Sequence, residues 1–460
     1  MCRTEYAASK TEEPARRFWT REAPLRPSAP SAGELAGWVI DAATRAWQLV
    51  ADLDADQLAV PLLPTVNPPL WEVGHLAWFQ EKTVLRDACG EAPALESADA
   101  LYDGAAVPHD TRWRLDLPPV AVIAAYARTV AERVAEEVTR PDATDVVRHL
   151  ARRTVHHYDA RAEALTSARQ TLGYPPPFLP GLSGAEPPAG HAGALSGDAE
   201  FAGGRFLLGA RMSEPFVHEA EEWAHVVEVA PFAMARAAVT QAEYAEFVEA
   251  GGYSDARLWP DGGAWLATTG ATRPRYWRGG RGGWRRRHFD TWVDLEPHLP
   301  VSHLSWWEAA AYCRWAGRRL PGEAEWEFAA AGGAPDRPRY PWGDEPPAAK
   351  TGVTDWRSSG PVDVGACAAG EGPGGCRQLI GNVWEWTASD FAAYPNAGPG
   401  APAASPGRFP GGRRTLRGGG WATRGRHVRS TMRDGLAPGR WDVAAGFRTC
   451  AVTAPADAPT

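Results

Sequence analysis

Apolar residues recur at helical spacing through the first part of the chain. Four stretches show this pattern, at about 31–49, 67–88, 120–138 and 142–172. The first begins with Ser31 and Glu34 at capping-box spacing, and the second has Pro68 and Pro69 near its first turn. Apolar positions three and four residues apart fall on one face of a helix. The pattern therefore predicts an antiparallel four-helix bundle.

The periodicity changes after residue 173. The chain becomes rich in Pro, Gly and Ala up to about residue 200, a composition typical of a linker. Beyond it, short β-like runs such as 205–208 and 225–229 alternate with turns, and only 241–250 and 306–316 have a convincing helical pattern. Such long loops indicate a loop-rich functional scaffold. We predict a disordered tail at 1–28, a helical bundle at 29–174, a linker at 175–200 and a second domain at 201–455.

Composition and charge narrow the class of protein. The chain has 460 residues, of which 44% are hydrophobic and 23% charged, as in a soluble protein of two domains. The N-terminal residues lack the apolar core of a signal peptide, and no apolar run is long enough to span a bilayer. A net charge of −8 argues against a nucleic-acid partner, because phosphate neutralisation needs a basic face. We expect a cytoplasmic monomer that binds neither nucleic acid nor membrane.

Cysteine and tryptophan usage adds two expectations. The six cysteines are scattered and form no C-x-x-C pair, which indicates reduced, structural thiols. The 22 tryptophans fall mainly in the second half, between Gly- and Pro-rich segments, and suggest loops held by aromatic anchors. The basic run at 278–287 lies among Gly and Trp and is interpreted as a solvated hairpin loop.

Motifs of the second half resemble a known domain. They include Gly381-Asn382-Val383-Trp384-Glu385-Trp386, Leu416-Arg417-Gly418-Gly419-Gly420-Trp421 and Ala445-Gly446-Phe447-Arg448. In their order and spacing they resemble the formylglycine-generating-enzyme (sulfatase-modifying factor) domain over about 203–453, which implies a C-type-lectin-like α+β fold. That enzyme holds copper with a C-terminal cysteine pair. The matching stretch, 421–447, contains no cysteine, so this activity is disfavoured.

The helical part points to one family that carries this domain. A four-helix DinB-like bundle ahead of it resembles the ergothioneine-synthase (EgtB) family, in which non-haem Fe(II) and dioxygen join a thiol to hercynine. The motif from Asn67 to His75 and the later Tyr102-Asp103 to His109-Asp110-Thr111-Arg112-Trp113 look closest to the selenoneine-synthase (SenA) branch, whose donor is a selenosugar. The resemblance thus implies hercynine and a thiol or selenosugar as small-molecule substrates, with dioxygen as co-substrate.

The resemblance also implies an iron site. The family holds iron with one histidine of the second helix and an H-x-x-x-H pair of the fourth, which places ligands at His75 and His157 but puts Arg161 at the third position. A guanidinium carries only donors and cannot bind iron. We expect Fe(II) to bind weakly. The third ligand stays open between His156 or Asp159, which point about 100° and 200° away from His157, a displaced His109, and water with Arg161 turned away or paired with an acid.

The substrate-site positions differ from the family as well. Where the family has Arg-Asn and an aromatic residue, the chain reads Arg433-Asp434-Gly435. Asp434 can attract the trimethylammonium group of hercynine, but Gly435 removes a stacking ring. The resemblance suggests Tyr394 as the proton donor, Arg86 and Arg112 as binders of the donor's acidic groups, and Arg433 and Asp434 as hercynine-binding residues.

Two other functions remain open from the sequence. A diverged relative without iron chemistry would persist as a binding protein or pseudoenzyme, which Arg161 and Gly435 favour. A metal-dependent thiol transferase working through the bundle is the third possibility, but that chemistry also needs three ligands.

Overall fold

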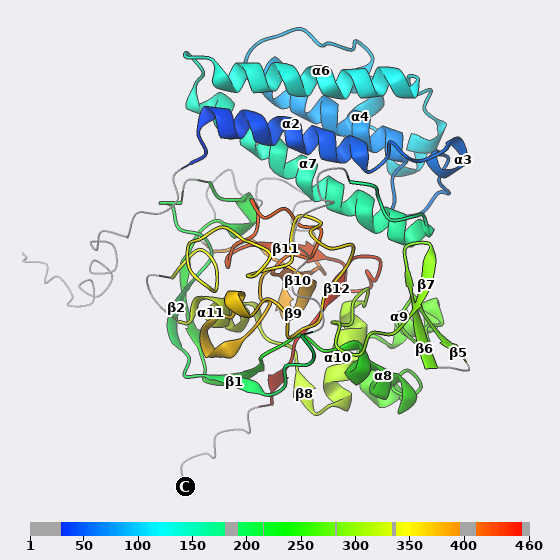
Figure 1. Cartoon of the computed structure of the whole chain (residues 1–460), viewed down its shortest axis with the longest axis vertical. Coiled ribbons are helices and arrows are strands. Elements are labelled where there is room, and N and C mark those ends of the chain that lie inside the picture. The colour runs from blue at the N-terminus through cyan, green and yellow to red at the C-terminus, as the bar shows by residue number, and fades with distance from the viewer. Residues whose placement is uncertain are drawn as a thin grey trace, which may run out of the picture.

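The computed structural model describes residues 29–179, 192–214, 216–280, 283–333, 337–395 and 411–452. Over these residues the chain forms a helical bundle stacked on a second, mixed domain (Figure 1). The predicted α+β fold class is confirmed. The predicted tail at 1–28 and part of the predicted linker lie outside the described residues.

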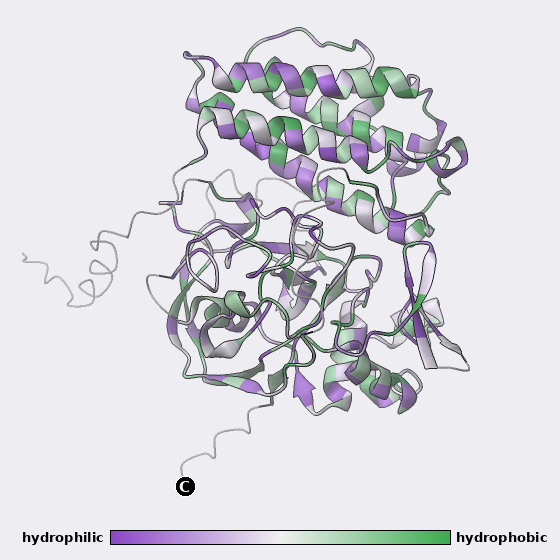
Figure 2. Ribbon diagram, viewed as in Figure 1, coloured by the Kyte–Doolittle hydropathy of each residue, from purple (hydrophilic) through white to green (hydrophobic). Residues whose placement is uncertain are grey.

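Four long helices build the bundle: α2 (Ala32–Gln48), α4 (Pro69–Gln80), α6 (Val120–Thr139) and α7 (Asp145–Leu172). Helices α2 and α4 each pack against α6 and α7. Figure 2 shows apolar and polar residues alternating along α2 and α6, as expected where one face is buried. The short elements α3 (Ala55–Leu58), α5 (Ala98–Tyr102) and the 3-10 helix η2 (His109–Arg114) connect the long helices.

The second predicted helix is interrupted near its end. Helix α4 continues as the π-helix η1 (Glu81–Arg86), where the hydrogen-bond pattern widens by one residue. Glu81 is fully buried there and accepts hydrogen bonds from the backbone N–H of Ala94 at 2.6 Å and the hydroxyl of Tyr126 at 2.8 Å. These contacts fix the end of α4 against α6.

The second domain contains two four-stranded sheets. One has the order β1 (Asp198–Phe201), β4 (Phe232–Ala235), β13 (Cys450–Ala451) and β8 (Arg318–Arg319). The other has the order β11 (Arg433–Leu436), β10 (Arg414–Arg417), β9 (Trp384–Asp390) and β12 (Ala445–Gly446), with β12 parallel to β9. Because Arg433 and Asp434 lie on β11, this second sheet carries the residues predicted to bind hercynine.

Two smaller sheets and several helices complete the domain. The ribbon of β2 (Gly204–Leu208) and β3 (His225–Val229) is separate from the sheet of β5 (Trp277–Gly280), β6 (Gly283–His288) and β7 (Thr291–Asp294). The basic run at 278–287 thus belongs to a β-hairpin whose last arginine contacts the bundle, since Arg287 Nη2 donates to the carbonyl of Thr171 at 3.2 Å. The remaining 3-10 helices are η3 (Glu219–Glu221), η4 (Ala256–Leu258), η5 (Ala368–Gly370) and η6 (Pro373–Gly375).

The described residues of this domain form four α-helices, whereas the sequence predicts only two. Helices α8 (Gln241–Glu249) and α10 (Trp306–Trp315) match the prediction, and α9 (Gly263–Thr269) and α11 (Glu323–Ala331) were missed. Helix α11 buries residues on all sides, so it has no polar face to create a periodic pattern. Its Glu323 and Glu327 bind the fully buried Arg417 at 2.9 and 2.6 Å.

The tryptophan motifs hold these loops, as expected. Trp326 Nε1 donates to Glu385 at 2.8 Å, and Arg448 pairs with both oxygens of Glu385 at 2.7 Å. Cysteines 89, 313, 367, 376 and 450 are free thiols. None of the described helices combines the length and the apolar character that crossing a bilayer requires.

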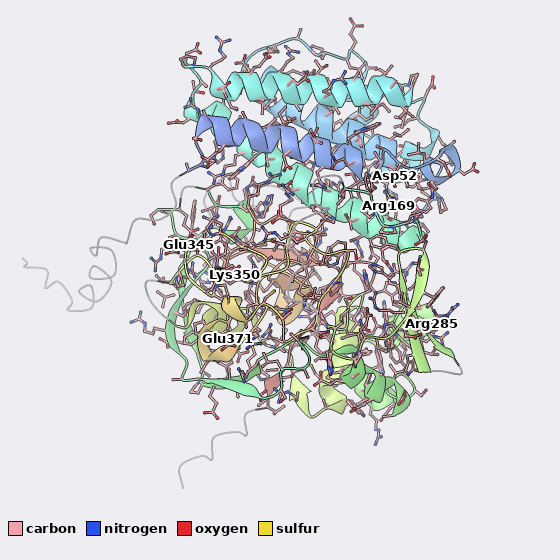
Figure 3. The ribbon with its side chains drawn as sticks, viewed as in Figure 1. Asp52, Arg169, Arg285, Glu345, Lys350 and Glu371 are labelled. Carbon is pink, nitrogen blue, oxygen red and sulfur yellow. The ribbon has the colours of Figure 1, made fainter. Side chains whose placement is uncertain are left out.

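Helix α7 joins the two domains. Figure 1 shows it running between the other bundle helices and the second domain. Its Asp159 accepts two hydrogen bonds from Arg426, both at 2.6 Å, and one from His427 Nε2 at 2.7 Å. Although burial opposes ionisation, Arg426 and His427 lower the pKa of Asp159. At its C-terminal end, Arg169 binds Asp52 at 2.7 and 2.8 Å, and the two side chains are labelled in Figure 3.

Asp159→Ala should destabilise the protein strongly, because it leaves two buried donors of the second domain without their carboxylate. Breaking a buried pair in this way costs about 3–5 kcal/mol. Urea denaturation followed by tryptophan fluorescence measures the free energy of unfolding. Asp41→Ala is the matched control, since Asp41 also binds Arg426 but its side chain is 39% exposed; its loss should be below about 1 kcal/mol. Equal losses of unfolding free energy in Asp159→Ala and Asp41→Ala would contradict the prediction that Asp159 makes the stronger contact.

Candidate active site

His75 is held in one orientation inside the bundle. It lies on α4, is 7% exposed, and its Nδ1 lies 2.8 Å from the carbonyl oxygen of Tyr102. A carbonyl can only accept, so Nδ1 carries the proton and Nε2 presents its lone pair. The ring stacks on Trp71 at 5.0 Å between centroids, and a Cβ built on Gly104 would lie 3.2 Å from it. A histidine fixed through its other nitrogen is a common arrangement for a metal ligand.

His157 of α7 meets His75 directly. The two Nε2 atoms lie 3.2 Å apart, and the ring of Phe79 packs on His157 at 4.4 Å between centroids. Burial lowers the pKa of His75, and burial together with Arg161 lowers the pKa of His157 well below its ordinary value. Both imidazoles are therefore neutral at neutral pH. Two nitrogens bound at right angles to one metal at about 2.1 Å lie about 3.0 Å apart, so the pair fits a shared metal ion.

Arg161 occupies the neighbouring position, one turn after His157. Its Nε lies 2.9 Å from Oε1 of Glu72, although neither atom forms a hydrogen bond of good geometry. The other oxygen of Glu72 accepts from Asn67 Nδ2 at 2.6 Å. Of the arrangements left open by the sequence, the structure shows Arg161 paired with an acid. Within the described ranges, no three His, Cys, Asp or Glu side chains form a group that could hold a metal.

The other candidate ligands have different partners. His156 meets His427 edge to face at 3.7 Å between centroids, and Asp159 belongs to the interdomain contact described above. His109 Nε2 lies 3.0 Å from the carbonyl of Val66. The structure brings none of these three side chains to the pair of His75 and His157.

A cleft of about 410 Å³ separates α7 from the second domain. Arg161 lines it, so the cleft reaches the edge of the histidine pair. The opposite wall comes from β9, β10, β11 and the loop before β11, and its apolar members are Trp384, Leu416, Met432, Leu436 and Val443. Neither His75 nor His157 lines this cleft, which is large enough for small molecules, and Arg161 is the residue through which the two regions adjoin.

Two carboxylates face this cleft without an ion pair among the described residues. Glu163 of α7 accepts hydrogen bonds from Trp384 Nε1 at 2.6 Å and Thr423 Oγ1 at 2.8 Å. Burial raises the pKa of Glu163 to about 7, and the charge of Asp434 contributes to this shift. Asp434 is exposed to the cleft, but the surrounding protein displaces enough water to raise its pKa as well. The part of the cleft around Glu163 and Asp434 therefore attracts cations.

The remaining predicted site residues make structural contacts. Arg433 lines the cleft, but it is 4% exposed and binds both oxygens of Glu323 at 2.7 and 2.9 Å. Tyr394 does not line the cleft: its buried hydroxyl donates to Glu323 at 3.2 Å, and its ring lies under Arg433. Because Tyr394 contacts Glu323 of α11, the side chain suggested as the proton donor is enclosed by protein.

The two predicted donor-binding arginines also have partners. Arg112 stacks on Trp71 at 3.8 Å and donates to Asn67 at 2.8 Å and to the carbonyl of Gly104 at 3.3 Å. It thereby supports the segment that packs on His75. Arg86 binds Asp99 through two hydrogen bonds of 2.6 and 2.8 Å, and it does not line the cleft.

Sequence reasoning missed Glu72 and Glu163. Glu72 precedes His75 by three residues, which places both on one helical face, and this spacing was the signal available. Glu163 gave no such signal, because a glutamate on an amphipathic helix usually faces water.

Comparison with known proteins identifies the family. Residues 8–172 match the DinB superfamily, and residues 195–453 match the sulfatase-modifying factor enzyme 1-like domain. The chain is 34% identical over 442 residues to the hercynine oxygenase of Mycolicibacterium thermoresistibile, which covers 92% of this chain and 95% of that protein. This chain belongs to the hercynine oxygenase family. Its EgtB-type resemblance is thereby confirmed, and the protein is an enzyme of the oxidoreductase type.

Other relatives agree with membership of the hercynine oxygenase family. The hercynine oxygenase of Mycobacterium tuberculosis is 33% identical over 426 residues, covering 90% of this chain and 98% of that protein. The formylglycine-generating enzyme of Streptomyces coelicolor is 35% identical but covers only 51% of this chain. The likeness to formylglycine-generating enzymes is thus confined to the second domain.

Arg161→His should strengthen Fe(II) binding, because it replaces a charge that repels the cation by a third imidazole beside His75 and His157. We expect an affinity at least about tenfold higher. Anaerobic titration with Fe(II), with free metal measured by a chromophoric chelator, gives the dissociation constants. Arg148→His, on the face of α7 opposite His157, is the control and should leave the affinity unchanged. Equal iron occupancy in Arg161→His and the unmodified protein would refute the prediction.

Proposed function

We propose that this protein forms a carbon–sulfur or carbon–selenium bond on the imidazole of hercynine, using Fe(II) and dioxygen. The observation that carries the proposal is the 3.2 Å approach of the His75 and His157 Nε2 atoms, next to Arg161 of an interdomain cleft in which two carboxylates form no ion pair with the described residues. Membership of the hercynine oxygenase family supports hercynine as the substrate. The motifs at 67–75 and 102–113 favour the selenoneine branch, with a selenosugar as donor.

Each group of the site has a distinct task in this proposal. His75 and His157 would hold the iron through Nε2, and bound iron would supply positions for dioxygen and the chalcogen donor. Glu163 and Asp434 attract the trimethylammonium group of hercynine by charge, and the indole of Trp384 borders the same region. The apolar residues of the second domain line the cleft and limit the access of water to the reacting imidazole.

The second candidate is a binding protein of the same fold without iron chemistry. The ion pair between Arg161 and Glu72 favours it, because the guanidinium stands where a metal ligand is expected. Both candidates use the same cleft and the same cation-attracting carboxylates. They differ in whether a product forms.

A product assay distinguishes the two candidates. The protein, reconstituted anaerobically with Fe(II), is given hercynine, oxygen and one of three donors: a selenosugar, γ-glutamylcysteine or cysteine. Mass spectrometry should detect a hercynine adduct containing selenium with the first donor. His157→Ala, which removes one proposed ligand, should abolish the product. No product from any donor, with bound iron measured in the same sample, would favour the binding protein.

Hercynine binding should tighten as the pH rises through about 7. The pKa of Glu163 is raised to about 7, so this carboxyl is neutral below that pH and becomes an anion above it. The trimethylammonium cation binds the ionised form better, which predicts an affinity about tenfold higher at pH 8 than at pH 6. Thr423, Trp384 and Asp434 are the groups that act on Glu163.

Isothermal titration of hercynine into the protein at several pH values measures this dependence. Glu163→Gln should remove most of it and bind hercynine with the affinity of the protonated form. Glu345→Gln is the control, since Glu345, labelled in Figure 3, is an exposed carboxylate of the second domain that does not line the cleft. A pH dependence that survives Glu163→Gln would exclude Glu163 as its origin.

A further inference from the structure

Helices α4 and α7 run antiparallel and meet side chain by side chain. Gln80 contacts Thr154 at 3.1 Å, His75 contacts His157 at 3.2 Å, and Glu72 contacts Arg161 at 2.9 Å. Each step toward the N-terminus of α4 is thus a step toward the C-terminus of α7. Glu72 therefore lies opposite the position where a third ligand from α7 would stand.

Glu72 is a buried carboxylate whose Oε1 forms an ion pair with Arg161 but no hydrogen bond of good geometry. The residue is 3% exposed, and Asn67 occupies only its Oε2. Its Oε1 has no hydrogen bond, and Nε of Arg161, although close, has none either. A buried carboxylate without good partners is costly, so Oε1 needs a cation. The side chain of Arg161 is 35% exposed and lines the cleft, whereas that of Glu72 is 4% exposed. Of the two, Arg161 is the side chain that can move away.

Two imidazoles and one carboxylate on one face of a metal form the facial set that non-haem Fe(II) oxygenases use, with the other positions open. We propose that Glu72 supplies the third ligand of this protein's metal site, its Oε1 exchanging Arg161 for the metal ion, while Arg161 turns into the cleft. The inference rests on the proposed function for the presence of a metal at His75 and His157. It accounts for Arg161, because a carboxylate ligand makes a third histidine unnecessary.

The exchange of Arg161 for a metal ion at Glu72 is also electrostatically favourable. Without metal, Arg161 compensates the negative charge of Glu72. With a divalent cation between the histidines, the carboxylate compensates the metal instead, and moving the guanidinium away removes a repulsion that grows steeply at short distance. Glu72 needs only a rotation of its side chain, since it lies on the same face of α4 as His75. Asn67 can retain its hydrogen bond to the second oxygen.

Metal binding without substrate tests the proposal. Co(II), a spectroscopic substitute for Fe(II), is titrated into metal-free protein, and visible absorption and chelator competition give its ligand field and dissociation constant. Four proteins form a double-mutant cycle: the unmodified chain, Glu72→Gln, Arg161→Ala and the double variant. Arg161→Ala should bind Co(II) at least as tightly as the unmodified chain. Glu72→Gln should weaken binding at least about tenfold in both backgrounds and change the absorption bands.

The double-mutant cycle distinguishes two roles of Glu72, that of a metal ligand and that of a counter-charge to Arg161. If Glu72 only compensates Arg161, then Glu72→Gln has no effect once Arg161 is alanine, and that result would overturn the proposal. Glu72→Asp keeps the charge but shortens the side chain. It should weaken Co(II) binding if Glu72 is a ligand, and retained affinity would count against that role.

Two further proteins control for folding and for the histidine pair. Glu81→Gln changes another buried carboxylate, at the first residue of η1 directly after α4, and should leave Co(II) binding unchanged. Circular dichroism verifies that each variant is folded. Arg161→His retains the histidine pair and adds a ligand. If it binds Co(II) and the unmodified chain does not, the role of Glu72 is overturned while the histidine pair stands. If neither binds, the metal site itself and the iron chemistry of the proposed function fail.

Discussion

The carboxylate of Asp159 is the contact on which the geometry of the site depends. It is 3% exposed on the face of α7 opposite His157, and it binds Arg426 and His427 of the second domain. One face of α7 thus belongs to the bundle and the other to the interface. Because the helix is rigid, fixing one face against the second domain also fixes the histidine on the other face relative to the cleft. Neither domain alone contains both walls of the site.

Electrostatics divides the cleft into regions of different chemistry. Most of its arginines are already paired, as Arg429 is with Glu221 and Arg440 is with Asp442. Glu163 and Asp434 are the carboxylates of the cleft left without such a pair in the described part of the chain. Burial raises the pKa of both carboxyls, and the charge of Asp434 raises that of Glu163 further, which makes the free site unfavourable for two negative charges. A bound cation relieves that cost, so the same arrangement that weakens the empty protein favours its ligand.

Much of the fold was predictable, and the exceptions have physical reasons. The bundle helices show amphipathic periodicity, so their positions followed from the sequence. Helix α11 did not, because it is buried on every side. His75 and His157 were found from the family motif, and the pairing of Arg161 with an acid was among the open alternatives. That this acid is Glu72 follows from the antiparallel register of α4 and α7, which no local sequence pattern encodes. Tyr394 was selected as the one tyrosine of its segment, and its burial depends on Glu323 from the unpredicted helix.

Gly435 lies between Asp434 and Leu436 on β11, but unlike them it does not line the cleft. A Cβ at this position would lie 2.1 Å from Cγ of Phe391, so the space beside the glycine is filled by that ring and not empty. Phe391 in turn packs against the guanidinium of Arg433 at 4.7 Å. Restoring an aromatic residue at position 435 therefore requires Phe391 to move, and with it the support of Arg433. Under the proposed function, the charges of Glu163 and Asp434 attract the cation, and Trp384 is an aromatic residue of the same cleft. Charge attraction depends less on orientation than stacking does, so this cleft selects its ligand mainly by shape and charge.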